Sequence, residues 1–531
     1  FGWDVDNSEG NSEKYKEVIG EDRVRIGGQT KAPDYAFRLG GMRIFFVEAK
    51  KPSVNIKGKS EPSYQLKRYA WNSKIPISIL TDFEEFSVYD CTKKPELKEK
   101  AGTGRLEYYN FKDYVENFDK IWDIFSKESV LKGSFDRYVD SSKNKKGTSQ
   151  VDGEFLKEIE TWREKLAKNI AIRNTSLSVE ELNFCVQKTI DRILFLRICE
   201  DRGIESYGKL ENISGNPNVY QKLLDAFEDA DAKYNSGVFD FSKDAITREL
   251  SIDDDVLQQI ISNLYYPISP YDFSVLSVEI LGNVYEEFLG KIIRLTPAHI
   301  AKIEDKPEVK IAGGVFYTPE FVVEYIIKNT LDPKIDGKTP QEIEKIRILD
   351  PACGSGTFLL RAYSHLLDYH LNYYRKNPKK YKKEIYQFKE NQWFLTTEIR
   401  KKILLNNIFG VDIDPQAVEL TKLGLLLKVL ENETKETVNQ QLKLFQERAL
   451  PDLGNNIKCG NSLVNSSYYI KDKTSNSDKL YKIRPFDWDD KENGFGAIIV
   501  YIVIILALKL NNKKSKPDVF LIIIYLSNIF E

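Results

Sequence analysis

Short hydrophobic runs with alternating or β-branched residues occupy the first ninety positions of the chain. They lie at residues 24–26, 34–39, 43–50, 77–82 and 86–90. Alternation with a period of two predicts strands. Residues 61–73 place apolar side chains at helical spacing after a proline, which predicts one helix among the strands. We therefore expect a mixed αβ domain over residues 1–141.

Longer helical periods follow this domain. Apolar positions recur at three- and four-residue steps, which is typical of helices with one buried face. Polar, charged segments at 142–148 and 302–310 are typical of linkers. These features predict a helical connector over residues 149–301. Its basic residues, among them Arg192 and Arg197, could contact phosphates, but a plain helical core with a charged face is the favoured interpretation of each.

Strands and helices alternate from residue 311 onward. Strands are expected at 347–350, 408–414 and 456–460, and helices at 319–330 and from residues 357 and 416. Such alternation is typical of a mainly parallel, doubly wound, Rossmann-like sheet. The whole chain is thus expected to be an α/β multidomain protein, with its last domain over residues 311–499.

Two apolar runs close the sequence, at 497–508 and 519–526. Each is shorter than the roughly 18 residues that a membrane helix requires, so no membrane partner is expected. Buried β-strands, a shifted reading frame and membrane contact are three interpretations of these runs. Because the change in composition after about residue 499 is abrupt, we treat residues 500–531 as an aberrant apolar tail.

The composition and the net charge of the chain exclude some classes of protein. The 531 residues are 41% hydrophobic and 30% charged, which excludes wholesale disorder. A formal net charge of −2 means that any contact with nucleic acid must come from local patches. Short lysine runs, such as the one within 379–383, are the only low-complexity feature.

The cysteines and the first residue bear on location and completeness. Five cysteines without CxxC spacing argue against a disulfide framework and a zinc site, and they favour a reducing compartment. No signal-peptide pattern opens the chain, so we expect an intracellular protein. The chain starts at Phe1 and its only methionine is Met42, from which we expect N-terminal sequence to be missing.

A first group of polar residues follows the strands of the N-terminal domain. Asp34 opens one expected strand, and Glu48 ends the next with Lys50 on the same face. A hairpin between the strands would bring Asp34 beside them. Two converging carboxylates suit Mg²⁺, and the ammonium can orient a water molecule that attacks a phosphodiester. Gln65, on the following helix, adds a polar contact; the alternative is an ordinary exposed charge pair at a strand edge.

A second group lies in the last domain. The strand that ends at Asp350 is followed by a glycine-rich turn, Pro351-Ala352-Cys353-Gly354-Ser355-Gly356, and by an apolar helix. Such a turn lets the backbone approach a ligand closely. Asp412 ends a later strand, where its carboxylate can accept hydrogen bonds from both hydroxyls of a ribose. The separation of Asp350 from Asp412 greatly exceeds the roughly 20 residues of a nicotinamide site. The alternative is an ordinary turn between a strand and a helix.

The first group, in its wider context, resembles a nuclease. The run PDYAF…FFVEAKKP, followed by a helix with Gln65 and Tyr69, is similar to the PD-(D/E)xK superfamily and to the N-terminal domain of restriction subunits. This resemblance implies that Asp34 and Glu48 bind Mg²⁺, that Lys50 is the catalytic lysine and that Gln65 is an accessory residue.

The second group resembles a DNA methyltransferase. The segments GGVFYTP, DPACGSGTF, GVDIDP and KCGNSL are similar to motifs X, I, II and III of the γ-class adenine-N6 methyltransferases, which use S-adenosylmethionine. The series of domains resembles type IIG restriction-modification enzymes of the Eco57I kind. The resemblance implies a double-stranded DNA substrate. It implies the following donor contacts: Thr318 to the carboxylate, Asp350, Pro351, Ala352, Gly354, Ser355 and Gly356 around the methionine portion, Asp412 to the ribose and Asn461 near the adenine ring.

One family motif is absent from the sequence. The Asn/Asp-Pro-Pro-Tyr/Phe segment that holds the target base occurs nowhere, and residues 494–499 run into the apolar tail instead. We therefore expect an incomplete methyltransferase domain that binds the donor without methyl transfer, beside an active endonuclease. A methyltransferase with an inert nuclease domain, and a non-catalytic remnant that binds DNA or donor, are the alternatives.

Overall fold

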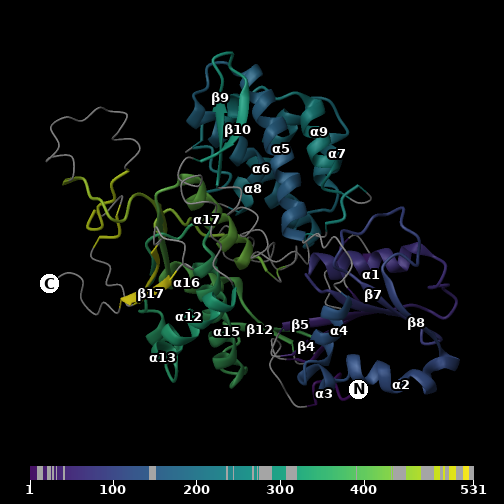
Figure 1. The fold of residues 1–531 in the computed structure, drawn as a ribbon. Helices are drawn as coiled ribbons and strands as arrows, with labels where there is room; N and C mark the ends of the chain where they lie inside the picture. Colours follow the sequence, from purple (N-terminus) through teal and green to yellow (C-terminus); the bar gives the residue numbers. More distant parts are fainter. Residues whose placement is uncertain are drawn as a thin grey trace. The chain divides into compact units, whose positions relative to one another are not determined.

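The computed structural model of the chain divides into two compact units (Figure 1). One unit comprises residues 1–162, 196–219 and 253–277, and the other comprises 163–195, 220–252 and 278–531. The structure describes residues 1–8, 16–20, 25–26, 29–30, 33–39, 42–142, 151–234, 237–242, 244–265, 268–271, 273, 290–306, 320–389, 392–431, 433, 450–467, 484–490, 494–496, 502–509 and 518–524. Within these ranges, no helix is both long enough and apolar enough to cross a membrane.

The first unit contains a six-stranded sheet in the order β1-β4-β5-β6-β7-β8. Its strands are β1 (Val18–Gly20), β4 (Tyr35–Leu39), β5 (Met42–Ala49), β6 (Ile77–Thr81), β7 (Glu85–Asp90) and β8 (Arg105–Asn110). Neighbours are antiparallel except β5 and β6, which helix α1 (Ser60–Asn72) connects as a parallel crossover. The two-residue strands β2 (Arg25–Ile26) and β3 (Gln29–Thr30) form a separate pair. The expected mixed αβ arrangement is confirmed, with β1 and β8 as strands that the hydrophobic pattern did not predict.

Alternation along β5 divides the hydrophobic core between the two faces of this sheet. Phe45 packs in one cluster with the helices α2 (Tyr114–Phe125), α3 (Lys127–Leu131) and α4 (Ser134–Ser142). The next residue, Phe46, packs in the other cluster with Leu66 and Tyr69 of α1. The sheet is therefore covered by helices on both faces, and its position in the core fixes the register of β4 against β5.

The expected connector is mainly helical. Its helices are α5 (Val151–Arg173), α6 (Val179–Asp201), α7 (Lys209–Ser214), α8 (Val219–Tyr234) and α9 (Asp254–Ser262), with a 3₁₀ turn at Thr247–Glu249. A hairpin of β9 (Lys291–Leu295) and β10 (Ala301–Asp305) follows, where the sequence predicted the end of a helical region and a linker. Polar and apolar residues alternate over the first four residues of β10, and Asn183 of α6 hydrogen-bonds both backbone groups of Ile293.

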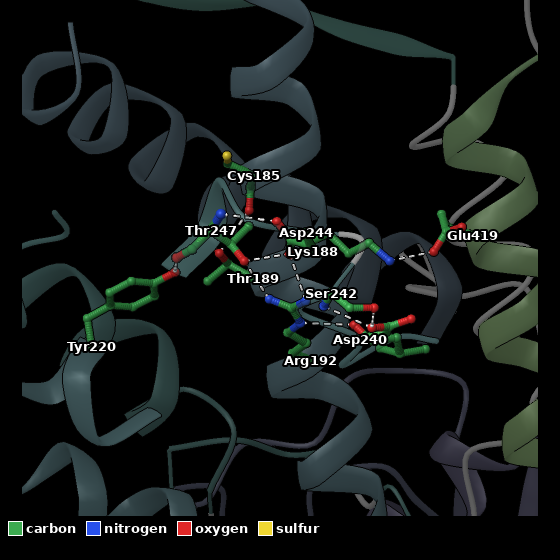
Figure 2. Close-up of polar contacts among 11 residues, drawn as sticks. Cys185, Lys188, Thr189, Arg192, Tyr220, Asp240, Ser242, Asp244, Thr247 and Glu419 are labelled. Carbon is green, nitrogen blue, oxygen red and sulfur yellow. Dashed lines mark hydrogen bonds and ion pairs between the residues drawn. The ribbon is translucent and has the colours of Figure 1, made fainter. Parts of the chain in front are cut away.

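The two arginines expected to reach phosphates are buried instead. Arg192 donates to Asp244, Thr247 and the carbonyl oxygen of Val238 at 2.7–2.9 Å, as Figure 2 shows for the side chains. Arg197 forms an ion pair with Asp201, with 2.7 Å between Nη1 and Oδ1. Both arginines therefore agree with the interpretation of a helical core and not with that of phosphate contacts, because a buried guanidinium requires internal acceptors and these residues have them.

The second unit contains a five-stranded sheet in the order β15-β14-β11-β16-β17. Its strands are β11 (Ile348–Asp350), β14 (Ile408–Asp412), β15 (Ile457–Cys459), β16 (Ile502–Lys509) and β17 (Asp518–Ile524). The first four in spatial order are parallel and β17 is antiparallel to β16. The expected mainly parallel pairing is thus found. Both apolar runs of the tail contain strands, which agrees with the strand interpretation; their origin in a shifted reading frame stays a prediction.

Helices connect the parallel strands of this sheet. They are α12 (Glu320–Thr330), α13 (Asp332–Ile335), α14 (Pro340–Ile343), α15 (Thr357–Arg375), α16 (Thr397–Asn407) and α17 (Pro415–Val429). A hairpin of β12 (Ile385–Lys389) and β13 (Gln392–Leu395) lies between α15 and α16. Because α15 and α17 begin where β11 and β14 end, the turns before these two helices share one edge of the sheet.

Candidate active sites

The first candidate site lies where β4 meets β5. Tyr35 pairs with Val47, so Asp34, one residue earlier, lies opposite Glu48. Asp34 Oδ2 accepts a hydrogen bond from the backbone N–H of Ala49 at 2.7 Å. The N–H of Lys50 donates to the carbonyl oxygen of Thr81 at 2.8 Å, which fixes the end of β5 against β6. The expected hairpin pairing is confirmed, although its glycine turn lies outside the described residues.

All four predicted residues meet at this point. Lys50 Nζ donates to Glu48 Oε1 and, at 3.3 Å, to Gln65 Oε1 of α1. Glu48 is only 1% exposed, so it is not the solvent-exposed charge pair of the alternative interpretation. Burial raises the pKa of Glu48 to about 7; Lys50 lowers it and Asp34 raises it further.

The remaining oxygen of Glu48 is the most informative atom of this site. Glu48 Oε2 is buried and has no hydrogen-bond partner in the part of the chain that the structure describes. Leaving a buried carboxylate oxygen unsatisfied costs about 1–3 kcal/mol or more. A divalent cation would satisfy it, and the facing carboxylate of Asp34 would be a second ligand. No group of three or more His, Cys, Asp or Glu suited to a metal occurs in the described ranges, so the two carboxylates would be the only such side-chain ligands here.

The second candidate site lies at the carboxyl ends of β11 and β14. Asp350 is buried and accepts from the N–H of Ala352 at 3.1 Å. Burial raises its pKa to about 7, and the charge of Asp412 contributes in the same direction. Asp412 accepts from the N–H of Gly354 at 2.8 Å and from that of Asp414 at 2.9 Å. Both predicted carboxylates therefore border the same glycine-rich turn.

Gly356 at the end of the glycine-rich turn, and Gly410 of the neighbouring strand β14, are packed too closely for larger residues. Gly354 and Gly356 have positive φ angles of 52° and 84°. A Cβ on Gly356 would lie 2.7 Å from Cγ2 of Thr421, and one on Gly410 would lie 2.7 Å from Cδ1 of Leu359. Thr421 Oγ1 also donates to the carbonyl oxygen of Gly354 at 2.8 Å. The turn is thus held between two helices and is more specific than an ordinary link between strand and helix.

Two residues that support the second candidate site were not predicted from the sequence. Thr421 braces the turn, and its signal was a lone hydroxyl in the apolar run of α17. Lys306 forms an ion pair with Asp414, whose carboxylate caps α17 by accepting from the N–H of Gln416 at 2.9 Å. Lys306 belongs to a segment that the sequence predicted to be a linker, where no local pattern marks a partner 108 residues away.

The structure describes most, but not all, of the other residues that were predicted to contact the donor. Asn461 follows β15, whose Cys459 pairs with Asp412, so Asn461 lies at the same edge of the sheet. Its Oδ1 accepts from the N–H of Leu463 at 3.0 Å. Ser355 is buried beside Thr357, with 3.1 Å between the two hydroxyl oxygens, and Pro351 is partly buried in the turn. Thr318 lies outside the described residues.

Comparison with known families assigns a different family model to each site. The model described as "Type I restriction enzyme R protein N terminus" matches residues 2–97, which include Asp34, Glu48, Lys50 and Gln65. The model described as "MmeI, DNA-methyltransferase domain" matches residues 334–484, which include Asp350, Asp412 and Asn461. Each match agrees with the resemblance seen in the corresponding motifs.

A curated relative matches across both sites. The chain is 38% identical over 489 residues to the type II restriction enzyme and methyltransferase RM.Eco57I of Escherichia coli, covering 92% of this chain. It spans 47% of the length of RM.Eco57I.

More distant matches are of the same kind. A putative type II restriction enzyme and methyltransferase of Methanocaldococcus jannaschii, RM.MjaORFECS2P, is 28% identical over 67% of this chain and 34% of its own length. A solved structure of the type IIL restriction-modification enzyme MmeI with DNA covers 60% of this chain and 41% of that one, at 14% identity and a TM-score of 0.38. The chain thus spans about half, or less, of the length of these relatives.

Proposed function

We propose that this chain is the part of a DNA restriction-modification enzyme that joins a Mg²⁺-dependent endonuclease to an S-adenosylmethionine-binding domain. The six-stranded sheet corresponds in this proposal to a PD-(D/E)xK-like nuclease core, and the five-stranded sheet to a Rossmann-like methyltransferase core. The observation that carries the proposal is the buried, unsatisfied Glu48 Oε2, with Asp34 facing it and Lys50 beside it. Homology to RM.Eco57I supports the combination of the two domains.

The residues of the first site suit phosphodiester hydrolysis. Asp34 and Glu48 would hold the cation, which supplies Lewis-acid polarisation of a phosphoryl oxygen and a more acidic water molecule when bound. Lys50 Nζ donates hydrogen bonds to Glu48 and Gln65, so its ammonium lies beside the carboxylate of Glu48. Its ammonium is placed to orient the attacking water and to balance negative charge on the phosphate. Gln65 acts through Lys50 and is therefore a positioning residue.

The residues of the second site suit a nucleoside with a charged amino-acid tail. Each oxygen of Asp412 accepts one backbone N–H and keeps a further lone pair for a ribose hydroxyl. An added Cβ on Gly354 would meet no atom within 4 Å, so the turn leaves room there for the methionine portion, next to Asp350. In the same proposal, Asn461 lies near the adenine ring and Thr318 contacts the donor carboxylate.

The same domain lacks the residues that methyl transfer requires. A flipped adenine has to be held by acceptors for its amino group and by an aromatic ring, and the Asn-Pro-Pro-Tyr type of segment is absent. The chain is therefore expected to bind the donor without transferring its methyl group. Tritium-labelled donor and duplex DNA should give no incorporation above background, and clear incorporation would overturn this part of the proposal.

Cleavage of supercoiled plasmid tests the nuclease. The chain should nick or cut the plasmid with Mg²⁺ and lose this activity with EDTA. Lys50→Ala should abolish it, whereas Lys51→Ala, which removes the same charge from an exposed neighbour, should retain most of it. Cleavage that persists in Lys50→Ala would contradict the assigned site. An inactive parent chain that still binds the donor would favour the alternative of an inert nuclease domain.

A further inference from the structure

The turn between α15 and β12, two elements labelled in Figure 1, contains a concentration of positively charged residues. Six of its nine residues over 375–383 are basic, and none is acidic. The six are Arg375, Lys376, Lys379, Lys380, Lys382 and Lys383. We refer to residues 375–383 as the basic turn. Because the whole chain has a net charge of −2, this concentration is a local property.

The charges of the basic turn face solvent without acidic partners. All five lysines are exposed, and Arg375 is partly buried. Within the described ranges, no carboxylate forms an ion pair with any of the six. Some exposed lysines elsewhere are neutralised: Lys132, Lys157 and Lys168 pair with Glu128, Glu154 and Glu164. Electrostatic repulsion among these six side chains of the basic turn is therefore not offset by ion pairs, and binding of a polyanion would reduce it.

Ring packing and backbone hydrogen bonds connect the basic turn to the residues around it. Tyr374 is buried, and its ring centroid lies 4.9 Å from that of Tyr381. The N–H groups of Lys380 and Tyr381 both donate to the carbonyl oxygen of Asn377, at 3.1 and 3.3 Å. The N–H of Ile385 donates to the carbonyl oxygen of Tyr381 at 3.1 Å, which joins the turn to β12. The lysines are thus presented by an ordered backbone, which lowers the entropy cost of binding through them.

The basic turn is remote from the donor site. Helix α15 begins at Thr357, directly after the glycine-rich turn, and its 19 residues run away from that turn. At a rise of 1.5 Å per residue, its far end lies roughly 28 Å from the turn. The lysines therefore cannot belong to the pocket for the donor or for a target base.

We propose that the basic turn binds the phosphate backbone of duplex DNA at a surface outside the donor site. Duplex DNA carries one negative charge per about 1.7 Å of its axis, which matches closely spaced cations. Lysines act here as point charges, so the contact is independent of base sequence. The inference rests on the proposed function, since it assumes that DNA is the substrate.

Salt-dependent binding of DNA tests this surface. The probe is a fluorescent duplex of about 30 base pairs in Ca²⁺ instead of Mg²⁺, titrated by anisotropy at several salt concentrations. The test variant replaces Lys379, Lys382 and Lys383 by Gln. The control replaces Lys132, Lys157 and Lys168 by Gln, so both lose three positive charges. The test variant should bind more weakly, and the slope of log Kd against log salt should decrease by about 0.9 per lost contact. The control should match the parent chain.

Each other outcome has a defined meaning. Equal slopes for the test variant and the control would overturn the basic turn as a DNA surface and leave the proposed function standing. A parent chain that binds no duplex would contradict the proposed function and this inference together. Binding of single-stranded RNA that is tighter than that of the duplex, and is lost in the test variant, would replace DNA by RNA as the partner.

Discussion

Asp350 illustrates how a functional residue can oppose stability. It is buried with one backbone hydrogen bond, and its pKa is raised to about 7. The folded chain therefore holds its proton more tightly than the unfolded chain does. Its contribution to stability is complete below the ordinary carboxyl pKa and is lost as pH rises toward 7. Above neutral pH, the buried negative charge is retained for its role in ligand binding.

Asp350→Asn should stabilise the donor-free chain at alkaline pH. The amide keeps an acceptor for the N–H of Ala352 and removes the buried charge. The free energy of unfolding should rise by up to about 4 kcal/mol at about pH 8 and change little at about pH 4. Urea unfolding at the two pH values measures this, with Asp368→Asn on the partly exposed face of α15 as the control. An equal effect at both pH values would contradict the assigned titration.

Gly356→Ala should distort the glycine-rich turn. It adds a Cβ at a φ of 84° and 2.7 Å from Cγ2 of Thr421. Strain and overpacking together should cost about 2–4 kcal/mol and weaken donor binding. Gly337→Ala is a matched control, because its φ is 70° and no atom lies within 4 Å of the added Cβ. Calorimetric unfolding should show the larger loss for Gly356→Ala, and equal losses would leave only the backbone strain.

Helix α17 shows what the sequence could and could not predict. The pattern predicted a helix near residue 416 after a strand ending at Asp412, because local periodicity and turn residues determine both. The same local logic placed Asp34, Glu48 and Lys50 on adjoining strands. It could not identify Lys306 or Lys188, whose partners on or before α17 lie 108 and 231 residues away. It also could not decide whether Arg192 and Arg197 were core residues or phosphate ligands, because burial is a property of the tertiary fold.

Lys188 and Glu419 join α6 to α17 within one unit (Figure 2). Although burial opposes it, attraction by Lys188 and Lys422 lowers the pKa of Glu419 to about 2. Lys188→Met should destabilise the chain by about 2–4 kcal/mol, because it leaves Glu419 with less compensation. The double variant Lys188→Met/Glu419→Leu should recover part of this loss. Unfolding at neutral pH completes the double-mutant cycle, and additive losses would show that the pair is not coupled.

The pair also predicts a response to acid. A carboxyl with a lowered pKa contributes stability above its ordinary value and loses it as pH falls toward 2. The difference between the parent chain and the double variant should therefore shrink between about pH 4.5 and pH 2. A difference that is constant over this interval would contradict the assignment.

At the scale of the whole molecule, the two candidate sites belong to different compact units. The metal site is built from residues 34–65 of the first unit, and the donor site from residues 350–461 of the second. Each unit has its own sheet and its own hydrophobic core. A mutation can therefore abolish ligand binding at one candidate site without abolishing ligand binding at the other.

S-adenosylmethionine should raise the melting temperature of the chain. At a concentration of 100 times Kd, binding adds about 2.7 kcal/mol of stability. Asp412→Ala should lose most of this increase, whereas Lys50→Ala should keep it. Thermal melts of the three proteins, each compared with its own donor-free sample, measure the effect. An undiminished increase in Asp412→Ala would contradict the ribose assignment.

The backbone hydrogen bonds of Asp412 have a consequence for how the donor enters. Two N–H groups already orient this carboxylate before any ligand is present, and Thr421 secures the loop opposite it. The carboxylate of Asp412 would therefore need little reorientation when a nucleoside binds, because its position is already fixed in the folded chain. Association should be fast and accompanied by only small changes in amide hydrogen exchange along residues 350–357, since that loop is rigid in advance.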